Sequence, residues 1–112
     1  MSTRRRELPL PPGTLDLLTL KTLSVQPMHG YGLAQHLRKL SADVIDVEQG
    51  TLYPALQRMR QKGWIKAEWR QTPNNQRARY YSVTAAGRRR LDEEAEGFED
   101  LIAAVRRIMR FA

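Results

Sequence analysis

Apolar side chains recur at helical spacing through the first half of the chain and predict helices. A first helix is expected over residues 14–24, where apolar side chains cover much of the surface, as in a helix at the centre of a core. Thr14 is the candidate N-cap of this helix, and Pro27 follows its end. A second helix is expected over residues 30–40, with apolar positions at Leu33, Ala34, Leu37 and Leu40.

A third predicted helix covers residues 49–62 and contains a proline. Pro54 lacks a backbone N–H, so it is tolerated best near the first turn of a helix. We therefore expect this helix to start late or to bend near its start. Gly63 is placed to end it. The apolar positions that predict its buried side are Leu52, Ala55, Leu56 and Met59.

After Gly63 the pattern changes to an alternation with a period of two. Residues 64–70 and 78–83 are predicted strands, and the polar residues 71–76 between them are typical of a turn. A lone hairpin is marginally stable in water, so it must pack on the helices. We expect Tyr81 and Val83 to belong to the core, and Trp64 and Trp69 to be packing residues.

A long last helix is predicted over residues 85–109, with Thr84 as its N-cap. Its apolar residues step by four and three positions, which is the spacing of a heptad seam. Such a seam pairs two helices, so it predicts a homodimer. The arginines at 88–90 are interpreted as a solvated face with salt bridges to acids such as Asp92 and Glu93. The predicted dimerisation residues are Leu91, Ala95, Phe98, Ile102, Val105 and Met109.

The order of these elements predicts a mainly α fold with a small β-hairpin, of the α+β class. Three helices followed by a hairpin form a winged helix-turn-helix, here with a long C-terminal dimerisation helix. We divide the chain into a flexible basic and proline-rich arm at 1–12, a winged helix-turn-helix domain at 13–84 and the dimerisation helix at 85–112.

Positive charge is concentrated in the middle of the chain. The formal net charge is +7, and residues 49–90 carry ten basic side chains and a single acid, Glu68. Residues 91–112 carry three basic and six acidic side chains. This asymmetry indicates a polyanionic partner such as nucleic acid, although a solvated basic face without a partner has the same composition.

Several classes of protein find no support in the sequence. The chain has no cysteine, and neither His29 nor His36 has the company of other metal-ligating residues, so we expect no metal and no cofactor. It has no glycine-rich phosphate loop and no set of residues typical of a nucleophilic enzyme, so we expect no catalysis. No apolar run approaches the ~20 residues of a membrane span, which predicts a soluble, cytoplasmic protein.

Six short stretches lie in order between residues 13 and 91: GTLDLL (13–18), PMHGY (27–31), QGTLYPAL (49–56), GWIKAEW (63–69), RYYSVT (79–84) and GRRRL (87–91). Together they resemble the PadR family of transcriptional regulators. The resemblance implies a winged helix-turn-helix regulator that binds double-stranded DNA. The short C-terminal tail is similar to that of the small PadR type, in which the last helix pairs two subunits.

In a helix-turn-helix protein, the helix predicted at 49–62 would lie in the major groove. Arg58 can bind guanine or a phosphate, and Thr51 can bond to a base or offer its methyl group to thymine. Some candidates on this helix have alternative roles: Thr51 could be an N-cap, and Tyr53 could pack against the hairpin. Gly50 would allow close approach of the backbone to the duplex, or be a turn residue only. The candidates on this helix are Gly50, Thr51, Tyr53, Pro54 and Arg58.

Further DNA contacts are expected from the second helix and the hairpin. A phenol at the start of the second helix, Tyr31, can donate to a phosphate, whereas His29 is interpreted as a turn or packing residue. Arginines near a minor groove respond to its negative potential. Asn74 is assigned to turn geometry. The hairpin candidates are Lys66, Asn75, Arg77 and Arg79.

These observations favour a sequence-specific DNA-binding regulator, a repressor that binds a palindromic operator as a homodimer. The alternative is a winged-helix module used for protein–protein contacts or nonspecific DNA packaging. The PadR family includes members that bind planar drugs or phenolic acids. By that resemblance, Trp64 and Trp69 are candidates to stack on a planar or phenolic effector in a dimer cleft.

Overall fold

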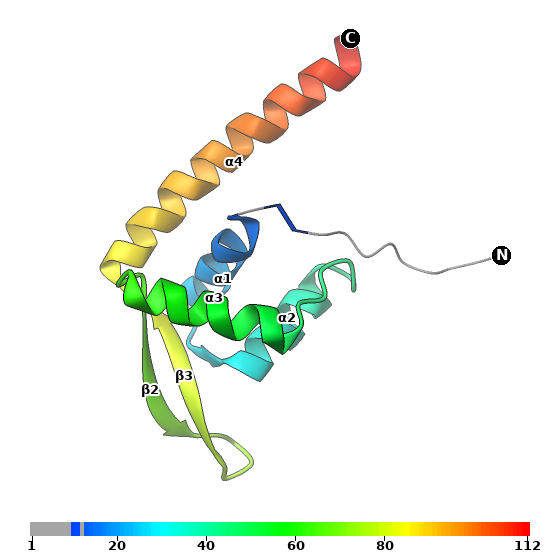
Figure 1. The fold of residues 1–112 in the computed structure, drawn as a ribbon. Coiled ribbons are helices and arrows are strands. Elements are labelled where there is room, and N and C mark those ends of the chain that lie inside the picture. Colours follow the sequence, from blue (N-terminus) through cyan, green and yellow to red (C-terminus); the bar gives the residue numbers. More distant parts are fainter. Residues whose placement is uncertain (1–9, 12) are drawn as a thin grey trace, which may run out of the picture.

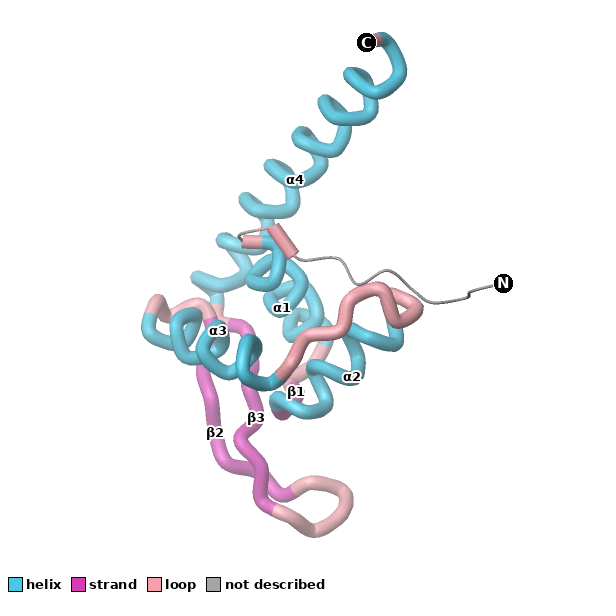
Figure 2. The backbone as a smooth tube through the Cα atoms, turned by 45° about the vertical axis from the view of Figure 1, so that its right-hand side comes forward, coloured by secondary structure: helices cyan, strands magenta, loops and turns pink. Residues whose placement is uncertain are grey.

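The computed structural model describes residues 10, 11 and 13–112, and it has the predicted α+β winged-helix architecture (Figure 1). The hairpin of β2 and β3 and the long helix α4 leave the body formed by the other helices in opposite directions (Figures 1 and 2). No helix among the described residues is long and apolar enough to cross a bilayer. The elements are α1 (Thr14–Val25), β1 (Met28–His29), α2 (Gly30–Leu40), α3 (Gln49–Gln61), β2 (Ile65–Gln71), β3 (Arg77–Val83) and α4 (Ala85–Phe111).

The starts of the first and third helices differ from the sequence predictions. The N-cap of α1 is Gly13 in a left-handed conformation, so the assignment of Thr14 as the cap is wrong. Helix α3 begins at Gln49 after an N-cap at Glu48, so the expected late start is also wrong. Pro54 is therefore the sixth residue of α3, where it cannot donate a hydrogen bond to the carbonyl of Gly50.

A short strand that the sequence did not reveal completes the sheet. β1 has only two residues and pairs antiparallel with β3, with Met28 opposite Tyr81 and His29 opposite Tyr80. The order of the strands is β1-β3-β2, and β3 therefore lies in the middle. This pairing ties the start of α2 to the hairpin, because α2 begins at the residue after β1.

The core lies where the helices meet the base of the hairpin. Leu20, Leu33, Leu52 and Leu56 are completely buried there, and Tyr81 is buried beside them as predicted. Leu91, expected in the dimer seam, is instead part of this core, so it is not available to a partner. Leu10, expected in a flexible arm, packs against the same core; residues 1–9 and 12 of that arm lie outside the described residues.

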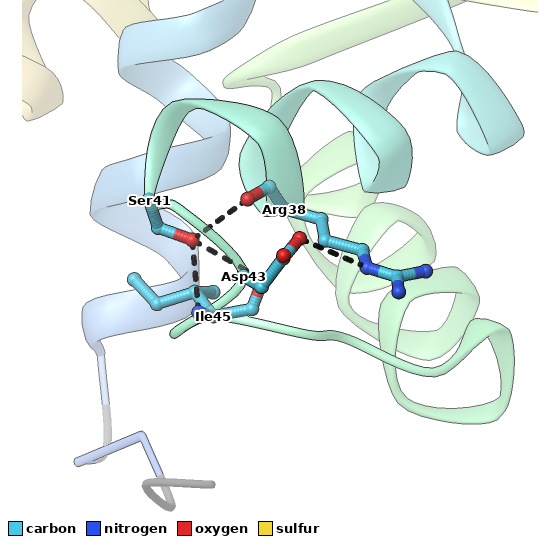
Figure 3. Close-up of polar contacts among 4 residues, drawn as sticks. All are labelled: Arg38, Ser41, Asp43 and Ile45. Atoms are coloured by element: carbon cyan, nitrogen blue, oxygen red, sulfur yellow. Dashed lines mark hydrogen bonds and ion pairs between the residues drawn. The ribbon is translucent and has the colours of Figure 1, made fainter. Parts of the chain in front are cut away.

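The turn between α2 and α3 is held by polar contacts (Figure 3). The N–H of Ile45 donates to Oγ of Ser41 at 2.9 Å, and Nε of Arg38 lies 3.3 Å from a carboxylate oxygen of Asp43. Ala42 and Asp43 adopt positive φ angles of 53° and 68°. A left-handed conformation is unfavourable for residues other than glycine. The contacts in this turn offset that cost and hold both residues in place. The turn therefore sets the position of α3 relative to α2.

A tight joint connects α3, the hairpin and α4. Thr84 caps α4 as predicted: its Oγ1 accepts from the N–H of Gly87 at 3.0 Å and donates to the carbonyl of Gly63 at 2.6 Å. A Cβ at Gly87 would collide with the backbone carbonyl of Trp64. Lys62 and Arg90 each lie within 5 Å of the Trp64 ring centroid. The joint therefore fixes the direction in which α4 leaves the body.

Candidate nucleic-acid interface

A cleft of about 390 Å³ opens between the start of α2, the helix α3 and the hairpin. It brings together three of the predicted DNA contacts, which come from three different elements. Two are phenols and the third is a guanidinium group, so the cleft offers hydrogen-bond donors and positive charge to an anion. The lining residues are His29, Gly30, Tyr31, Tyr53, Trp69, Ala78, Arg79 and Tyr81.

Tyr31 is presented to the solvent at the start of α2, with 55% of its surface exposed. Its hydroxyl oxygen accepts a hydrogen bond from Nε2 of Gln35 at 2.9 Å. Because the oxygen is thus engaged as an acceptor, the phenolic hydrogen stays available as a donor. Tyr31 is therefore equipped to donate to a phosphate oxygen.

Tyr53 crosses from α3 to the start of α2. A Cβ at Gly30 would lie 2.7–2.9 Å from ring atoms and the hydroxyl of Tyr53, so the absence of a side chain at Gly30 makes room for the ring. The residue is still 42% exposed. Packing of Tyr53 was expected against the hairpin, but its ring and hydroxyl pack against Gly30 at the start of α2. The residue also lines the cleft, and its contact with DNA remains a prediction.

The hairpin carries its two predicted arginines on the face that looks into the cleft. Trp69 pairs with Arg79 across the strands, and Arg77 lies two residues further along on the same face. Among the described residues, neither arginine forms an ion pair, and Nε of Arg79 is buried without a hydrogen-bond partner. Both positive charges therefore remain unneutralised.

The other two hairpin candidates are placed differently. Lys66 lies on the opposite face of the hairpin, with Glu68 and Arg70, so it is not brought to the cleft. Asn75 has a positive φ of 65°, and its side chain accepts from Gln71 at 2.6 Å. Its N–H closes a turn onto the carbonyl of Thr72, which places Asn74 inside that turn, as expected. Asn75 thus also serves the turn.

The outer face of α3 is open. At about 100° per residue, Gly50, Pro54 and Gln57 lie roughly opposite the buried residues of this helix. A Cβ at Gly50 would meet nothing within 4 Å, so nothing in the described chain requires glycine there. Close approach of DNA to Gly50 remains a prediction. Gln57 was missed as a candidate, because residue types were weighed before helical position.

Two candidates on α3 lie on its other flank, toward α1. Arg58 forms an ion pair with Asp16 in the first turn of α1, and this use competes with a DNA contact. Thr51 lines a hollow with Leu15. The N-cap of α3 is Glu48, so the reading of Thr51 as the cap is wrong. DNA contacts by these two residues remain predictions.

His29 has a structural role, in line with its interpretation as a turn or packing residue. It is the N-cap of α2, and its Nδ1 accepts from the N–H of Gly32 at 3.0 Å. Its ring also meets that of Tyr80 edge to face, with centroids 5.3 Å apart.

The two tryptophans do not form a pair. Trp64 is half-buried in the joint beneath α4, whereas Trp69 is 58% exposed near the far end of the hairpin. They are separated by about 16 Å of strand at roughly 3.3 Å per residue. The exposure of Trp69 contradicts the packing role expected for it. A single chain does not bring the two tryptophans together, and stacking of a planar effector in a dimer cleft remains a prediction. The exposure of Trp69 could not be read from its residue type.

Comparisons with known proteins agree with this geometry. The sequence model described as "Transcriptional regulator PadR-like family" matches residues 19–93. A PadR family transcriptional regulator from Eggerthella lenta is 30% identical, with a TM-score of 0.77 over 89% of this chain and 85% of that one. A Streptococcus transcriptional regulator is 29% identical, with a TM-score of 0.77 over 87% and 93%. A Streptococcus mutans protein, 19% identical with a TM-score of 0.84 over 95% of both chains, shares the fold.

The fold defines a winged-helix protein, and the exposed outer face of α3 suits the recognition helix of the DNA-binding members of that class. The chain belongs to the PadR-like family of transcriptional regulators, because the family model covers well over half of its residues. It is therefore a DNA-binding transcription regulator. Proteins of this kind are generally not enzymes.

Proposed function

We propose that the protein is a homodimeric, sequence-specific repressor that binds a palindromic operator. One observation carries the proposal: the open face of α3 lies beside a cleft that gathers Tyr31, Tyr53 and Arg79 from three elements. A helix that enters the major groove needs such flanking groups to hold the phosphates on either side.

In this docking the outer face of α3 reads bases. Gln57 can bind adenine bidentately, and Pro54 can contact a thymine methyl group. Gly50 allows the helix to approach the duplex closely. The hairpin then reaches the neighbouring stretch of the duplex, where Arg77 can bind a backbone phosphate.

The surface of α4 supports the dimer. Its apolar positions continue past the body of the protein, and nothing in the described chain covers them. A contiguous exposed apolar stripe on a helix marks a protein-binding surface. A groove of about 240 Å³ beside it, between α1 and α4, could receive a partner's helix. The large exposed residues of the stripe are Phe98, Leu101, Val105, Ile108, Met109 and Phe111.

The charges along α4 suit a second copy that runs in the opposite direction. Six acids lie between residues 92 and 100, and three arginines lie between residues 106 and 110. In an antiparallel pair that crosses near Ile102, each arginine segment would face the partner's acidic segment. In a parallel pair, like charges would face each other.

A two-fold dimer explains why we expect a palindrome. It presents two recognition helices one helical turn, ~34 Å, apart on the DNA. Two DNA-binding domains related by two-fold symmetry require half-sites with the same symmetry. The described elements supply DNA reading and pairing. A dimer bound to an operator that overlaps a promoter blocks that promoter without any further activity. We therefore propose repression.

Selection from a random pool of duplexes, followed by titration at fixed salt, tests the proposal. We expect a palindromic site that binds two chains at least ~10³-fold more tightly than a shuffled duplex. Equal affinity for both duplexes would identify a nonspecific packaging protein instead.

A further inference from the structure

The inner face of the hairpin carries an exposed tryptophan between two arginines. The guanidinium carbon of Arg77 lies 5.3 Å from the ring centroid of Trp69, and that of Arg79 lies 5.9 Å from it. Both distances are within the range of a cation–π interaction. Trp69 is more than half exposed, so it adds little to the core.

Arg77 and Arg79 contact Trp69 and no acidic side chain of the described residues. Glu68 is bonded to Arg70 on the opposite face of the hairpin. No acid of the described chain forms an ion pair with either Arg77 or Arg79. Arginine side chains lose considerable rotamer freedom when a ligand orders them, and a preformed contact reduces that loss.

We propose that Trp69 is a positioning residue that holds the guanidinium groups of Arg77 and Arg79 ready for a phosphodiester of the DNA backbone. The proposal rests on the proposed function. A cation–π contact does not use the guanidinium N–H groups as hydrogen-bond donors, so the terminal N–H groups stay available to a phosphate. Arg79 and the Tyr31 hydroxyl line the same cleft, so one phosphate there could be held by both.

The first test compares Trp69→Leu with Trp69→Tyr, measured by titration of the selected operator and of a shuffled duplex. The leucine variant should bind both duplexes about tenfold more weakly, because phosphate contacts are independent of sequence. The salt dependence of the affinity should be the same for the leucine variant as for the wild type, since both arginines are still present. The tyrosine variant should bind within about threefold of the wild type, because its ring also supports a cation–π contact. Wild-type affinity in the leucine variant would overturn the proposal.

A double-mutant cycle separates positioning from direct contact. In an Arg77→Ala/Arg79→Ala background, Trp69→Leu should change affinity by less than about twofold, because the residues on which it acts are gone. The same tenfold loss in both backgrounds would show that Trp69 acts on DNA directly, and would overturn the proposal. Thermal unfolding of the leucine variant should match the wild type, and a markedly lower midpoint would indicate a structural role instead. Failure of the proposed function is distinguishable, because the wild type itself would then show no preference for any operator.

Discussion

The hairpin and the far end of α4 both expose large apolar side chains, but the groups around those side chains differ. On the hairpin, Trp69 is flanked by two arginines and lies in a cleft with the phenols of Tyr31 and Tyr53. On α4, Ile108 and Met109 are 62% and 79% exposed within a stripe of apolar side chains, and Arg110 contacts Phe111 at the end of that stripe. Exposed apolar area alone therefore does not identify a partner. The different neighbouring groups are the basis of our proposal of nucleic acid at one end and the helix of a second copy at the other.

The largest expected effect comes from charging the α4 stripe. Val105→Glu combined with Ile108→Glu would place carboxylates in an apolar interface, so we expect the protein to sediment as a monomer. Operator affinity should then fall about 10²–10³-fold, because the two DNA-binding domains are no longer linked and no longer bind as one unit. Ala103→Glu, on the opposite face of α4, is the matched control and should leave both properties unchanged. A dimer that persists in the double variant would place the interface elsewhere.

The next effect concerns the joint that connects the two ends. Gly87→Ala inserts a methyl group against the backbone carbonyl of Trp64, which cannot move without shifting α3 or the hairpin. We expect a loss of about 3 kcal/mol in the free energy of unfolding, measured by urea denaturation. Arg89→Ala, an exposed change in the same helical turn, should stay within about 0.5 kcal/mol of the wild type. Equal stability of the two variants would show that the joint is loose.

A smaller effect should distinguish the two faces of the hairpin. Arg79→Ala removes a cation from the cleft and should weaken operator binding about tenfold, with the salt slope reduced by about one. Lys66→Ala removes the same charge from the opposite face and should change affinity less than threefold. Titrations at several salt concentrations measure both quantities. A larger effect at Lys66 would mean that the hairpin meets DNA with its other face.

The smallest effect should appear in the core, away from both partner surfaces. Oγ1 of Thr19 is buried without a hydrogen-bond partner among the described residues. Replacing it with valine removes an unsatisfied polar atom at similar volume, so Thr19→Val should raise the free energy of unfolding by about 1 kcal/mol. DNA affinity should not change. Destabilisation would reveal a partner for this hydroxyl.

Much of the fold could be predicted because its signals are local. The change from a helical period to alternation marked the hairpin, and Thr84 was identified as a cap from its position before a long helix. β1 was missed because two residues carry no period, and only its pairing with β3 makes it a strand. Leu91 fits the heptad spacing, but spacing cannot tell which members of a seam face the body of their own chain.

The site was harder to predict because its geometry is not local. Tyr31, Tyr53 and Arg79 were chosen for their chemistry, and the fold brings them to one cleft. Arg58 was chosen in the same way, yet it is paired with Asp16, which lies 42 positions away in the sequence. Trp69 shows the opposite error, since a tryptophan suggests packing and only the register of the hairpin places it between two arginines.

Phosphate-ethylation interference on the selected operator tests the central claim most directly, because it locates each backbone contact. With the wild-type protein, we predict interference at phosphates beside the groove that α3 enters, repeated symmetrically in the two half-sites. With Arg79→Ala, interference should disappear at one phosphate in each half-site and persist at the others. An unchanged pattern in the variant would contradict the account, because the cleft would then hold no phosphate.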